Sequence, residues 1–150
     1  MIQPHETHPI LRVRDLSKSY KMGQVDVHAL KGVSLDIFPG QMTAIVGRSG
    51  SGKTTMLNLM AGLDRPTAGE IWFNDQPVNH LKESDLLRLR QKHFGFVFQS
   101  FGLLPLLSAA ENIGVPLRMR HMARDEREQR ITDALDWVGL TKRAKHRPYE

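Results

Sequence analysis

The residues with the clearest chemistry lie in one run of eight in the first half of the chain. The run Gly47, Arg48, Ser49, Gly50, Ser51, Gly52, Lys53 and Thr54 fits the pattern G-x-x-x-x-G-K-[ST] at every fixed position. Glycines let a backbone curl so that its N–H groups turn inward and form a concave site for the α- and β-phosphate oxygens of a nucleotide. The pattern therefore predicts a phosphate-binding loop.

The polar side chains at the end of this loop have separate roles. Lys53 supplies a mobile positive charge for the β- and γ-phosphates, which makes it the expected catalytic residue of the loop. The hydroxyl of Thr54 is the expected Mg²⁺ ligand, because this hard ion takes oxygen ligands. Thr55 and the turn after it open a helix whose positive end faces the anion.

A phosphate loop has to connect a buried strand to a helix, and the flanking residues predict both. Residues 42–46 form a short apolar, β-branched run that is typical of a buried parallel strand. The residues after the loop predict a helix that buries Met56, Leu57 and Met60, and Gly62 stands where a C-terminal cap is expected. The alternative is a glycine- and serine-rich turn with a surface lysine, and the two flanking elements disfavour it.

Length and composition indicate one compact domain. The chain has 150 residues, and its longest apolar stretches fall far short of the roughly 18 residues of a membrane span. The first nine residues lack the apolar core of a secretory signal, and the absence of cysteine excludes disulfides and thiolate metal sites. We therefore expect a cytoplasmic protein. Its net charge of +5 comes from basic residues interleaved with acidic ones, which favours a mixed solvated surface over a nucleic-acid partner.

The residues before the loop predict a small antiparallel β element. Residues 10–16 alternate apolar and polar side chains, and residues 33–38 do so less cleanly. Between them, residues 17–23 predict a polar loop that holds one aromatic side chain, Tyr20. Its ring offers a flat face for an adenine base. The alternative is a tyrosine that packs on its own hairpin.

Further elements are predicted after the phosphate loop. They are a strand at residues 71–73, a helix at residues 84–92 capped by Ser84, and a strongly apolar strand at residues 94–98. Gln99 follows this last strand, at the position where open α/β sheets bind ligands. Its side chain is placed to reach the Mg²⁺ or its water. The alternative is an ordinary residue at the end of a strand.

A capping box and an apolar loop mark the last third of the chain. Ser108 and Glu111 predict the start of a helix that Pro116 soon disturbs. Before it, residues 100–107 contain five large apolar side chains around a proline. Such a loop is either a satellite core or a docking surface.

A final helix is predicted from Asp125. Its buried face is marked by Ile131, Leu135 and Val138, and Gly139 marks its end. The tail after it is basic and is expected to end without closing any structural unit.

Several of these features together resemble one family. Tyr20, the loop 47–54, Gln99 within Phe98-Gln99-Ser100-Phe101, and Ala110-Glu111-Asn112 follow one another as in the nucleotide-binding subunit of an ABC transporter. The resemblance covers nearly all 150 residues. Residues 63–70 and 98–105 are further similar to the lipoprotein-releasing and macrolide-exporter branch of that family.

The resemblance implies an α/β fold of the P-loop NTPase class with a RecA-like core, and ATP with Mg²⁺ as ligand. The implied parts of one ATP-binding domain are an antiparallel β element over residues 1–40, a core with the phosphate loop over residues 41–99, and the Q-loop with the start of a helical subdomain over residues 100–150. Tyr20 is then the residue that stacks on adenine. Gln99 is then a catalytic residue, which contacts Mg²⁺ and signals to the membrane subunit.

The resemblance also implies partners. A transmembrane subunit would dock between Ser100 and Glu111, and a second ATP-binding subunit would pair head to tail with the first. The protein would lie on the cytoplasmic face of the inner membrane and couple ATP hydrolysis to substrate movement through its membrane partner. A small-molecule kinase and a nucleic-acid motor are alternatives, but neither accounts for Tyr20 and Gln99 at their positions.

Three motifs of the family are not found in these 150 residues: a Leu-Ser-Gly-Gly-Gln signature, an apolar strand ending in Asp-Glu, and a switch histidine. In the family they follow a segment like residues 147–150, so we expect the chain to stop just before the signature, with an incomplete sheet. The resemblance therefore implies an ATPase for the parent protein, whereas these residues alone are not expected to turn over ATP. The alternative is an ATP-binding fragment that does not hydrolyse the nucleotide.

Overall fold

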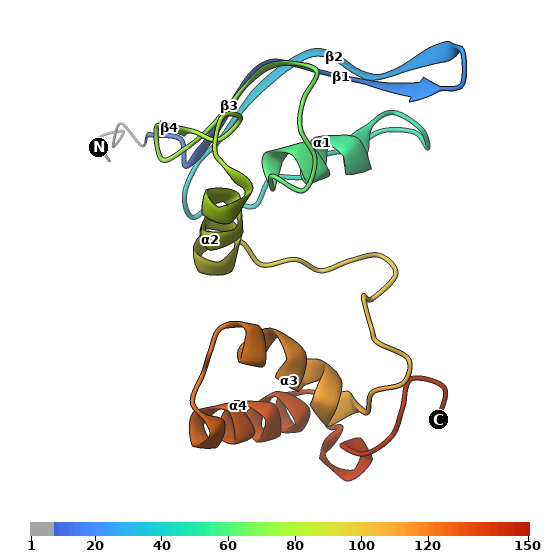
Figure 1. The fold of residues 1–150 in the computed structure, drawn as a ribbon, viewed down its shortest axis with the longest axis vertical. Coiled ribbons are helices and arrows are strands. Elements are labelled where there is room, and N and C mark those ends of the chain that lie inside the picture. The colour runs from blue at the N-terminus through green and yellow to red at the C-terminus, as the bar shows by residue number, and fades with distance from the viewer. Residues whose placement is uncertain (1–7) are drawn as a thin grey trace, which may run out of the picture. The chain divides into compact units, whose positions relative to one another are not determined.

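A computed structural model describes residues 8–150. These residues form two compact units, unit 1 up to Phe94 and unit 2 from Gly95 to Glu150 (Figure 1). The elements of unit 1 are β1 (Leu11–Met22), β2 (Val25–Ile37), α1 (Lys53–Met60), β3 (Ala68–Phe73), β4 (Gln76–Pro77) and α2 (Glu83–His93). Those of unit 2 are α3 (Ala109–Met119), α4 (Arg124–Trp137) and the short 3₁₀ helix η1 (Thr141–Arg143). Within the described residues, no helix is both long enough and apolar enough to cross a membrane.

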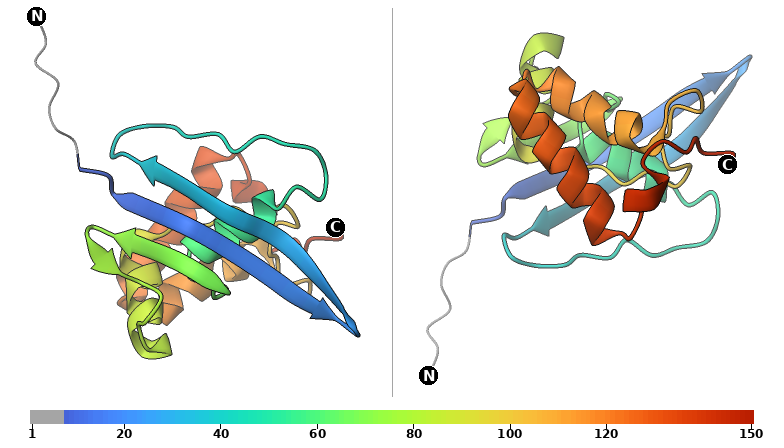
Figure 2. Two further views of the ribbon diagram at one scale, coloured as in Figure 1. Left: turned by 90° about the horizontal axis from the view of Figure 1, so that it is seen from above. Right: turned by 90° about the horizontal axis from the view of Figure 1, so that it is seen from below.

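The sheet of unit 1 is antiparallel, with the strand order β2-β1-β3-β4 (Figure 2). The strands predicted at residues 10–16 and 33–38 are confirmed, but both are longer than expected. The loop predicted at residues 17–23 is wrong, because most of it belongs to β1 and pairs with β2. The chain reverses only after Met22, where Gly23 takes a φ of 65°.

A bulge in β1 keeps its apolar side chains on one face of the sheet. The pairing register shifts between Val13 and Leu16, and Asp15 takes a φ of 49°. The extra residue restores the alternation, so Val13 and Leu16 both point inward and are fully buried. The N–H of Asp15 donates to Ser34 Oγ at 2.8 Å. Gly69 of β3 lies so close to the carbonyl oxygen of Asp15 that a Cβ would clash with it.

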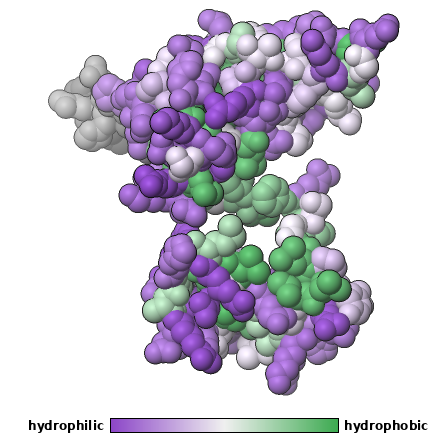
Figure 3. Space-filling view, viewed as in Figure 1, coloured by the Kyte–Doolittle hydropathy of each residue, from purple (hydrophilic) through white to green (hydrophobic). Residues whose placement is uncertain are grey.

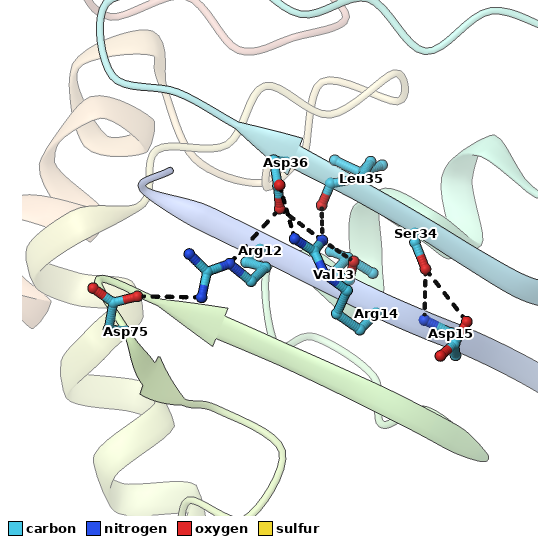
Figure 4. Close-up of polar contacts among 8 residues, drawn as sticks. All are labelled: Arg12, Val13, Arg14, Asp15, Ser34, Leu35, Asp36 and Asp75. Carbon is cyan, nitrogen blue, oxygen red and sulfur yellow. Dashed lines mark hydrogen bonds and ion pairs between the residues drawn. The ribbon is translucent and has the colours of Figure 1, made fainter. Parts of the chain in front are cut away.

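Charged side chains link β1 to its neighbours beside this bulge (Figure 4). The guanidinium of Arg14 donates two hydrogen bonds to the Asp36 carboxylate, at 2.7 and 2.8 Å. Arg12 adds ion pairs to Asp36 at 3.9 Å and to Asp75 at 3.5 Å. The hydrogen bond from Arg14 is the largest cause of the lowered pKa of Asp36. Because exposed ion pairs contribute little to stability, these contacts mainly support the strand register.

Helix α1 packs on one face of the sheet, and the core of unit 1 lies between them (Figure 2). The predicted helix after the phosphate loop is confirmed, and Met56 and Met60 are buried as expected. Leu57 is 54% exposed, and Leu59 is buried instead, because it lies three residues after Met56 on the same face. The sheet and the segment after it supply the other core side chains: Leu11, Val13, Leu16, Leu30, Ile71, Phe73, Val78 and Leu86.

The predicted glycine at the C-terminal end of α1 is confirmed, whereas the predicted N-terminal cap of α2 is not. Gly62 takes a φ of 63° just after α1, as the predicted cap requires. The predicted strand at residues 71–73 and the helix at residues 84–92 are also confirmed. However, α2 begins at Glu83, and its N-terminal cap is Lys82 without a side-chain hydrogen bond, so the predicted Ser84 cap is wrong.

Two predicted strands, the parallel one at residues 42–46 and the strongly apolar one at residues 94–98, are not formed in residues 8–150. Residues 42–46 and 94–98 belong to no strand, and Met42 and Val97 are fully exposed. A strand exists only where its backbone groups pair with a neighbouring strand, and the sheet of the described residues consists of β1 to β4. The apolar composition of both segments was therefore not sufficient to predict their secondary structure.

In unit 2, α3 begins with the predicted capping box. The N–H of Ser108 donates to Glu111 Oε2 at 2.8 Å, and the N–H of Glu111 donates to Ser108 Oγ at 3.3 Å. The backbone hydrogen bond from Ser108 is the largest cause of the lowered pKa of Glu111. Pro116 lies inside α3, which continues to Met119, so the predicted disturbance is wrong. Past the proline, the N–H of Arg120 donates to the Pro116 carbonyl at 3.2 Å, as in a regular helix.

Helix α4 packs against α3 where α3 has a glycine. Gly114 is buried, and a Cβ built on it would lie 3.3 Å from Ile131 Cδ1. Leu135 is buried as predicted. Val138 is exposed, against the prediction, because α4 ends one residue before it and Gly139 turns the chain with a φ of 67°.

The tail after α4 folds back onto the start of α3. The N–H groups of Ala109 and Ala110 donate to the carbonyls of His146 and Ala144, each at 2.9 Å. The first N–H groups of a helix have no partner within the helix, so the tail satisfies two of them. The expectation that the tail closes no structural unit is therefore wrong.

Candidate functional site

The predicted phosphate loop, residues 47–54, runs over the surface of unit 1 and ends in α1. Gly50 and Gly52 take φ angles of 79° and 89°, which disfavour any side chain. The N–H of Ser51 donates to the Arg48 carbonyl at 3.2 Å, and the N–H of Met56 donates to the Gly52 carbonyl at 2.8 Å. The first hydrogen bond closes a turn of the loop, and the second begins the helix.

One glycine of the loop, Gly52, is also required by its neighbours. A Cβ on Gly52 would clash with the carbonyl oxygen of Ala29 in β2 and would touch Leu30, which belongs to the core. A Cβ on Gly47 would meet Ser51 Oγ, a side-chain end that can rotate away, so Gly47 is not required in the same way. The loop is thus packed against the sheet at its end and against itself at its start, as a backbone cradle for a small anion requires.

Lys53 reaches back across the loop from the first position of α1. Its ammonium donates to the carbonyls of Gly47 and Arg48, each at 2.8 Å. These bonds hold a positive charge above the curled backbone. The first turn of α1 contains no acidic residue, so the positive end of the helix is not neutralised within its own first turn.

Two residues with side-chain hydroxyls, Thr54 and Thr55, come directly after Lys53. Thr54 is exposed and Thr55 is half-buried. An exposed hydroxyl beside an anion cradle, a lysine and a helix N-terminus is a suitable ligand for a hard cation such as Mg²⁺. The residues of the loop therefore fit a nucleotide phosphate with its metal ion.

Tyr20 lies in β1 and not in a loop. Its hydroxyl donates to Asp64 Oδ2 at 2.9 Å, and its ring carries the ammonium of Lys18 at 4.9 Å from the centroid. The side chain is nevertheless 38% exposed. The ring is thus both anchored and accessible within unit 1. The roles of Lys18 and Asp64 were not predicted, although a carboxylate just after a helix C-terminus and before a proline turn is a signal of local anchoring.

Gln99 lies in a turn of unit 2 and is exposed. The N–H of Phe101 donates to the Phe98 carbonyl at 3.0 Å, and Phe101 and Gly102 both take a positive φ, of 62° and 61°. Gln99 and the phosphate loop belong to different units. The expected contact between Gln99 and the metal ion stays a prediction.

A second loop, residues 100–107, presents apolar side chains. Phe101 is 80% exposed and Leu106 is 77% exposed. A groove of about 680 Å³ in unit 2 is lined mostly by apolar side chains, including Phe98 and Leu104 beside Ile113 of α3. Hydrophobic residues reach the surface of unit 2 among hydrophilic ones in Figure 3.

One side chain, that of Asn112, holds this second loop in place, and this role was not predicted. The amide of Asn112 donates to the carbonyls of Leu104, Leu107 and Ser108 at 2.9 to 3.1 Å. Its oxygen accepts the N–H of Leu104 at 2.8 Å. An asparagine that follows a capping box by one residue was the available signal, because its side chain points back toward the preceding loop.

Known proteins resemble this chain over most of its length. The model of the ABC transporter family matches residues 30–150. The chain is 44% identical over 140 residues to a protein of Marinobacter nauticus named macrolide export ATP-binding/permease protein MacB, covering 93% of this chain and 22% of that protein. It is 44% identical over 141 residues to a protein of Pseudomonas fluorescens named lipoprotein-releasing system ATP-binding protein LolD, covering 94% of this chain and 62% of that protein.

A solved structure is similar as well. It shows the ATP-binding cassette MJ0796 as a dimer in a post-hydrolysis state, bound to ADP and Pi, and the corresponding protein comes from Methanocaldococcus jannaschii. The structures align with a TM-score of 0.84 at 40% identity, covering 93% of this chain and 62% of the other. The P-loop NTPase fold is thereby confirmed, although the described sheet of this chain is antiparallel. The chain spans about three fifths of the length of LolD and MJ0796.

Proposed function

Because this chain belongs to the ABC transporter family, we propose that the protein is the ATP-binding subunit of a transporter and couples ATP hydrolysis to substrate movement through a membrane partner. The observation that carries this proposal is the loop 47–54, with Lys53 anchored to two loop carbonyls at the start of α1. The names of the relatives support a transport role in the lipoprotein-releasing or macrolide-export branch.

The residues of the loop each have a role in this proposal. Its N–H groups cradle the phosphates, and Lys53 exchanges its carbonyl partners for the β- and γ-phosphate oxygens. Thr54 is a ligand of Mg²⁺, which when bound neutralises charge on the β- and γ-phosphates. Arg48, Ser49 and Ser51 line the same cradle.

Two residues outside the loop complete the proposed site. Tyr20 stacks on adenine, which is consistent with an anchored and accessible ring. Gln99 contributes to the metal site and reports nucleotide binding to the membrane partner. Its exposed position, in a turn with two positive φ angles, is compatible with that role.

Membership of the family and the exposed apolar side chains of residues 100–107 both support protein partners. We expect a transmembrane subunit to dock between Ser100 and Glu111, where Phe101 and Leu106 are exposed. We expect a second copy to pair head to tail, since the similar MJ0796 cassette is dimeric. The protein would then lie on the cytoplasmic face of the inner membrane.

The alternative of an ATP-binding protein without hydrolysis is less favoured, because the similar cassette was captured in a post-hydrolysis state.

A calorimetric titration with MgATP tests the nucleotide site. Lys53→Ala removes the mobile charge, and we expect the affinity to fall about 10- to 100-fold, since hydrogen bonds to charged groups contribute about 1.5–3 kcal/mol. Lys142→Ala removes an exposed lysine of unit 2 and is the control, with the affinity of the wild type expected. Equal affinities of the wild type and Lys53→Ala for MgATP contradict the proposal.

A further inference from the structure

The Asp64 carboxylate joins two side chains of β1 to the segment after α1. Its Oδ2 accepts the hydroxyl of Tyr20 at 2.9 Å, and its Oδ1 accepts the ammonium of Lys18 at 2.7 Å. Both oxygens are therefore engaged by residues more than forty positions away in the sequence. The hydrogen bond fixes the hydroxyl end of the Tyr20 side chain, which is the part that moves farthest when χ1 changes.

Lys18 fixes the ring from a second direction. Its ammonium also donates to the Arg65 carbonyl at 2.6 Å, and its side chain is only 13% exposed. The same ammonium lies 4.9 Å from the centroid of the Tyr20 ring, within the range of a cation–π contact. One face of the ring is thus covered by a held cation, and the accessible part of Tyr20 is left for a ligand.

Asp64 is itself attached to the helix that carries the phosphate loop. The N–H groups of Leu63 and Asp64 donate to the carbonyl of Asn58 in α1, at 2.8 and 3.4 Å. Burial raises the pKa of Asp64, but hydrogen bonds from Lys18 and Tyr20 outweigh it and the pKa is lowered, so the group is ionised at neutral pH. The helix therefore holds the phosphate loop at one end and the anchor of the tyrosine at the other.

We propose that Asp64, assisted by Lys18, is a positioning residue for the nucleotide base: it holds the Tyr20 ring at a set distance and angle from the phosphate loop. This inference rests on the proposed function, in which Tyr20 stacks on adenine. A ring held in advance loses less side-chain entropy when the base binds. We expect the effect to be specific to ligands that contain a base, because the Asp64 carboxylate accepts hydrogen bonds from Tyr20, Lys18 and the Arg65 N–H and from no residue of the loop 47–54.

The test compares MgATP with magnesium tripolyphosphate, which has the phosphates without the base, by titration calorimetry. Tyr20→Phe keeps the ring and removes the donor to Asp64, and Asp64→Asn removes the charge that holds Lys18. We expect each variant to bind MgATP about three- to tenfold more weakly, because each loses one hydrogen bond that holds the ring. Tripolyphosphate affinity is expected to be unchanged. Asp133→Asn, in unit 2, is the control and is expected to behave as the wild type with both ligands.

The double variant and Tyr20→Ala separate the possible failures. Tyr20→Phe combined with Asp64→Asn is expected to weaken MgATP binding by less than the sum of the two single losses, since both variants act on the same ring through the Asp64 carboxylate. If Tyr20→Ala weakens MgATP binding but Tyr20→Phe does not, the inference on Asp64 is overturned and the stacking role of Tyr20 stands. If Tyr20→Ala binds MgATP as the wild type does, the stacking role itself fails. An equal loss for MgATP and tripolyphosphate in Asp64→Asn indicates a purely structural role and also overturns the inference.

Discussion

The phosphate loop of unit 1 and the apolar loop of unit 2 are built in the same way and differ in what they present. Each is irregular, and each is held by one side chain at the start of the following helix. Lys53 donates to two carbonyls of the first loop, and Asn112 donates to three carbonyls of the second. A helix start thus serves in both units as the anchor of the loop before it.

The difference lies in the chemistry of the anchor. Lys53 has only donors and a charge, so its two carbonyl partners are replaceable by phosphate oxygens, which are stronger acceptors. The side-chain amide of Asn112 both donates and accepts hydrogen bonds. It donates to the Leu104 carbonyl and accepts the Leu104 N–H, as a facing residue of an antiparallel strand would do. We infer that the first loop responds to a ligand, whereas the second is fixed in advance and presents its apolar side chains.

The largest expected effect is in the phosphate loop. Gly52→Ala places a Cβ against the Ala29 carbonyl at a φ of 89°, so both strain and a clash oppose it. We expect a loss of about 3 kcal/mol in the free energy of unfolding, measured by chemical denaturation, and loss of MgATP binding. Gly50→Ala shares the positive φ but meets open space, and its loss is expected to be about 1 kcal/mol. Equal losses in the two variants would show that packing on β2 is unimportant.

The apolar loop is tested by Asn112→Ala. Removal of the amide leaves the Leu104 N–H and three carbonyls without this partner, and we expect a loss of about 2 kcal/mol in the free energy of unfolding. Amide exchange should become faster in residues 100–107, as measured by hydrogen exchange with mass spectrometry. MgATP affinity should not change. Gln129→Ala, which removes one exposed side-chain contact in α4, is the control; protection of the loop equal to that of the wild type in Asn112→Ala would disprove the anchor role.

A smaller effect distinguishes the metal ligand from the rest of the cradle. Thr54→Ala removes the exposed hydroxyl, and we expect the gain in ATP affinity upon adding Mg²⁺ to fall about tenfold, with affinity for metal-free ATP unchanged. Thr54→Ser keeps the hydroxyl and should retain the gain. An undiminished response to Mg²⁺ in Thr54→Ala, measured by titration with and without the ion, would exclude this residue as a ligand.

The smallest effect concerns the capping box of unit 2. The pKa of Glu111 is lowered by its hydrogen bonds with Ser108, so its contribution to stability is present above the unfolded-state pKa of about 4.3 and is lost as the pH falls through the folded-state value. Glu111→Gln keeps an acceptor without a charge. The difference in stability between the wild type and this variant should shrink upon acidification from pH 7 to pH 3, as followed by thermal melting. A difference that is the same at both pH values would contradict the assignment.

Much of the candidate site was predictable because it depends on neighbours in the sequence. Three glycines and a lysine at set spacing specify the curled loop, since the φ angles of Gly50 and Gly52 are a local property. Ser108 and Glu111 form their capping box across three positions for the same reason. Gly62 and Gly139 end their helices through their own positive φ angles.

Contacts between distant segments were decided by the tertiary structure. No local rule indicated that Tyr20 belongs to a long strand, that its hydroxyl bonds Asp64, or that the tail caps α3. The apolar runs at residues 42–46 and 94–98 show the same limit, because strand formation requires a neighbour that composition does not reveal. The amino-acid sequence was enough to predict the curled conformation and the positive charge of the loop 47–54, because both depend on residues close together in the chain. The contacts of Asp64 with Tyr20 and Lys18 could be known only from the folded structure, because hydrogen bonds across more than forty residues form only when the chain has folded.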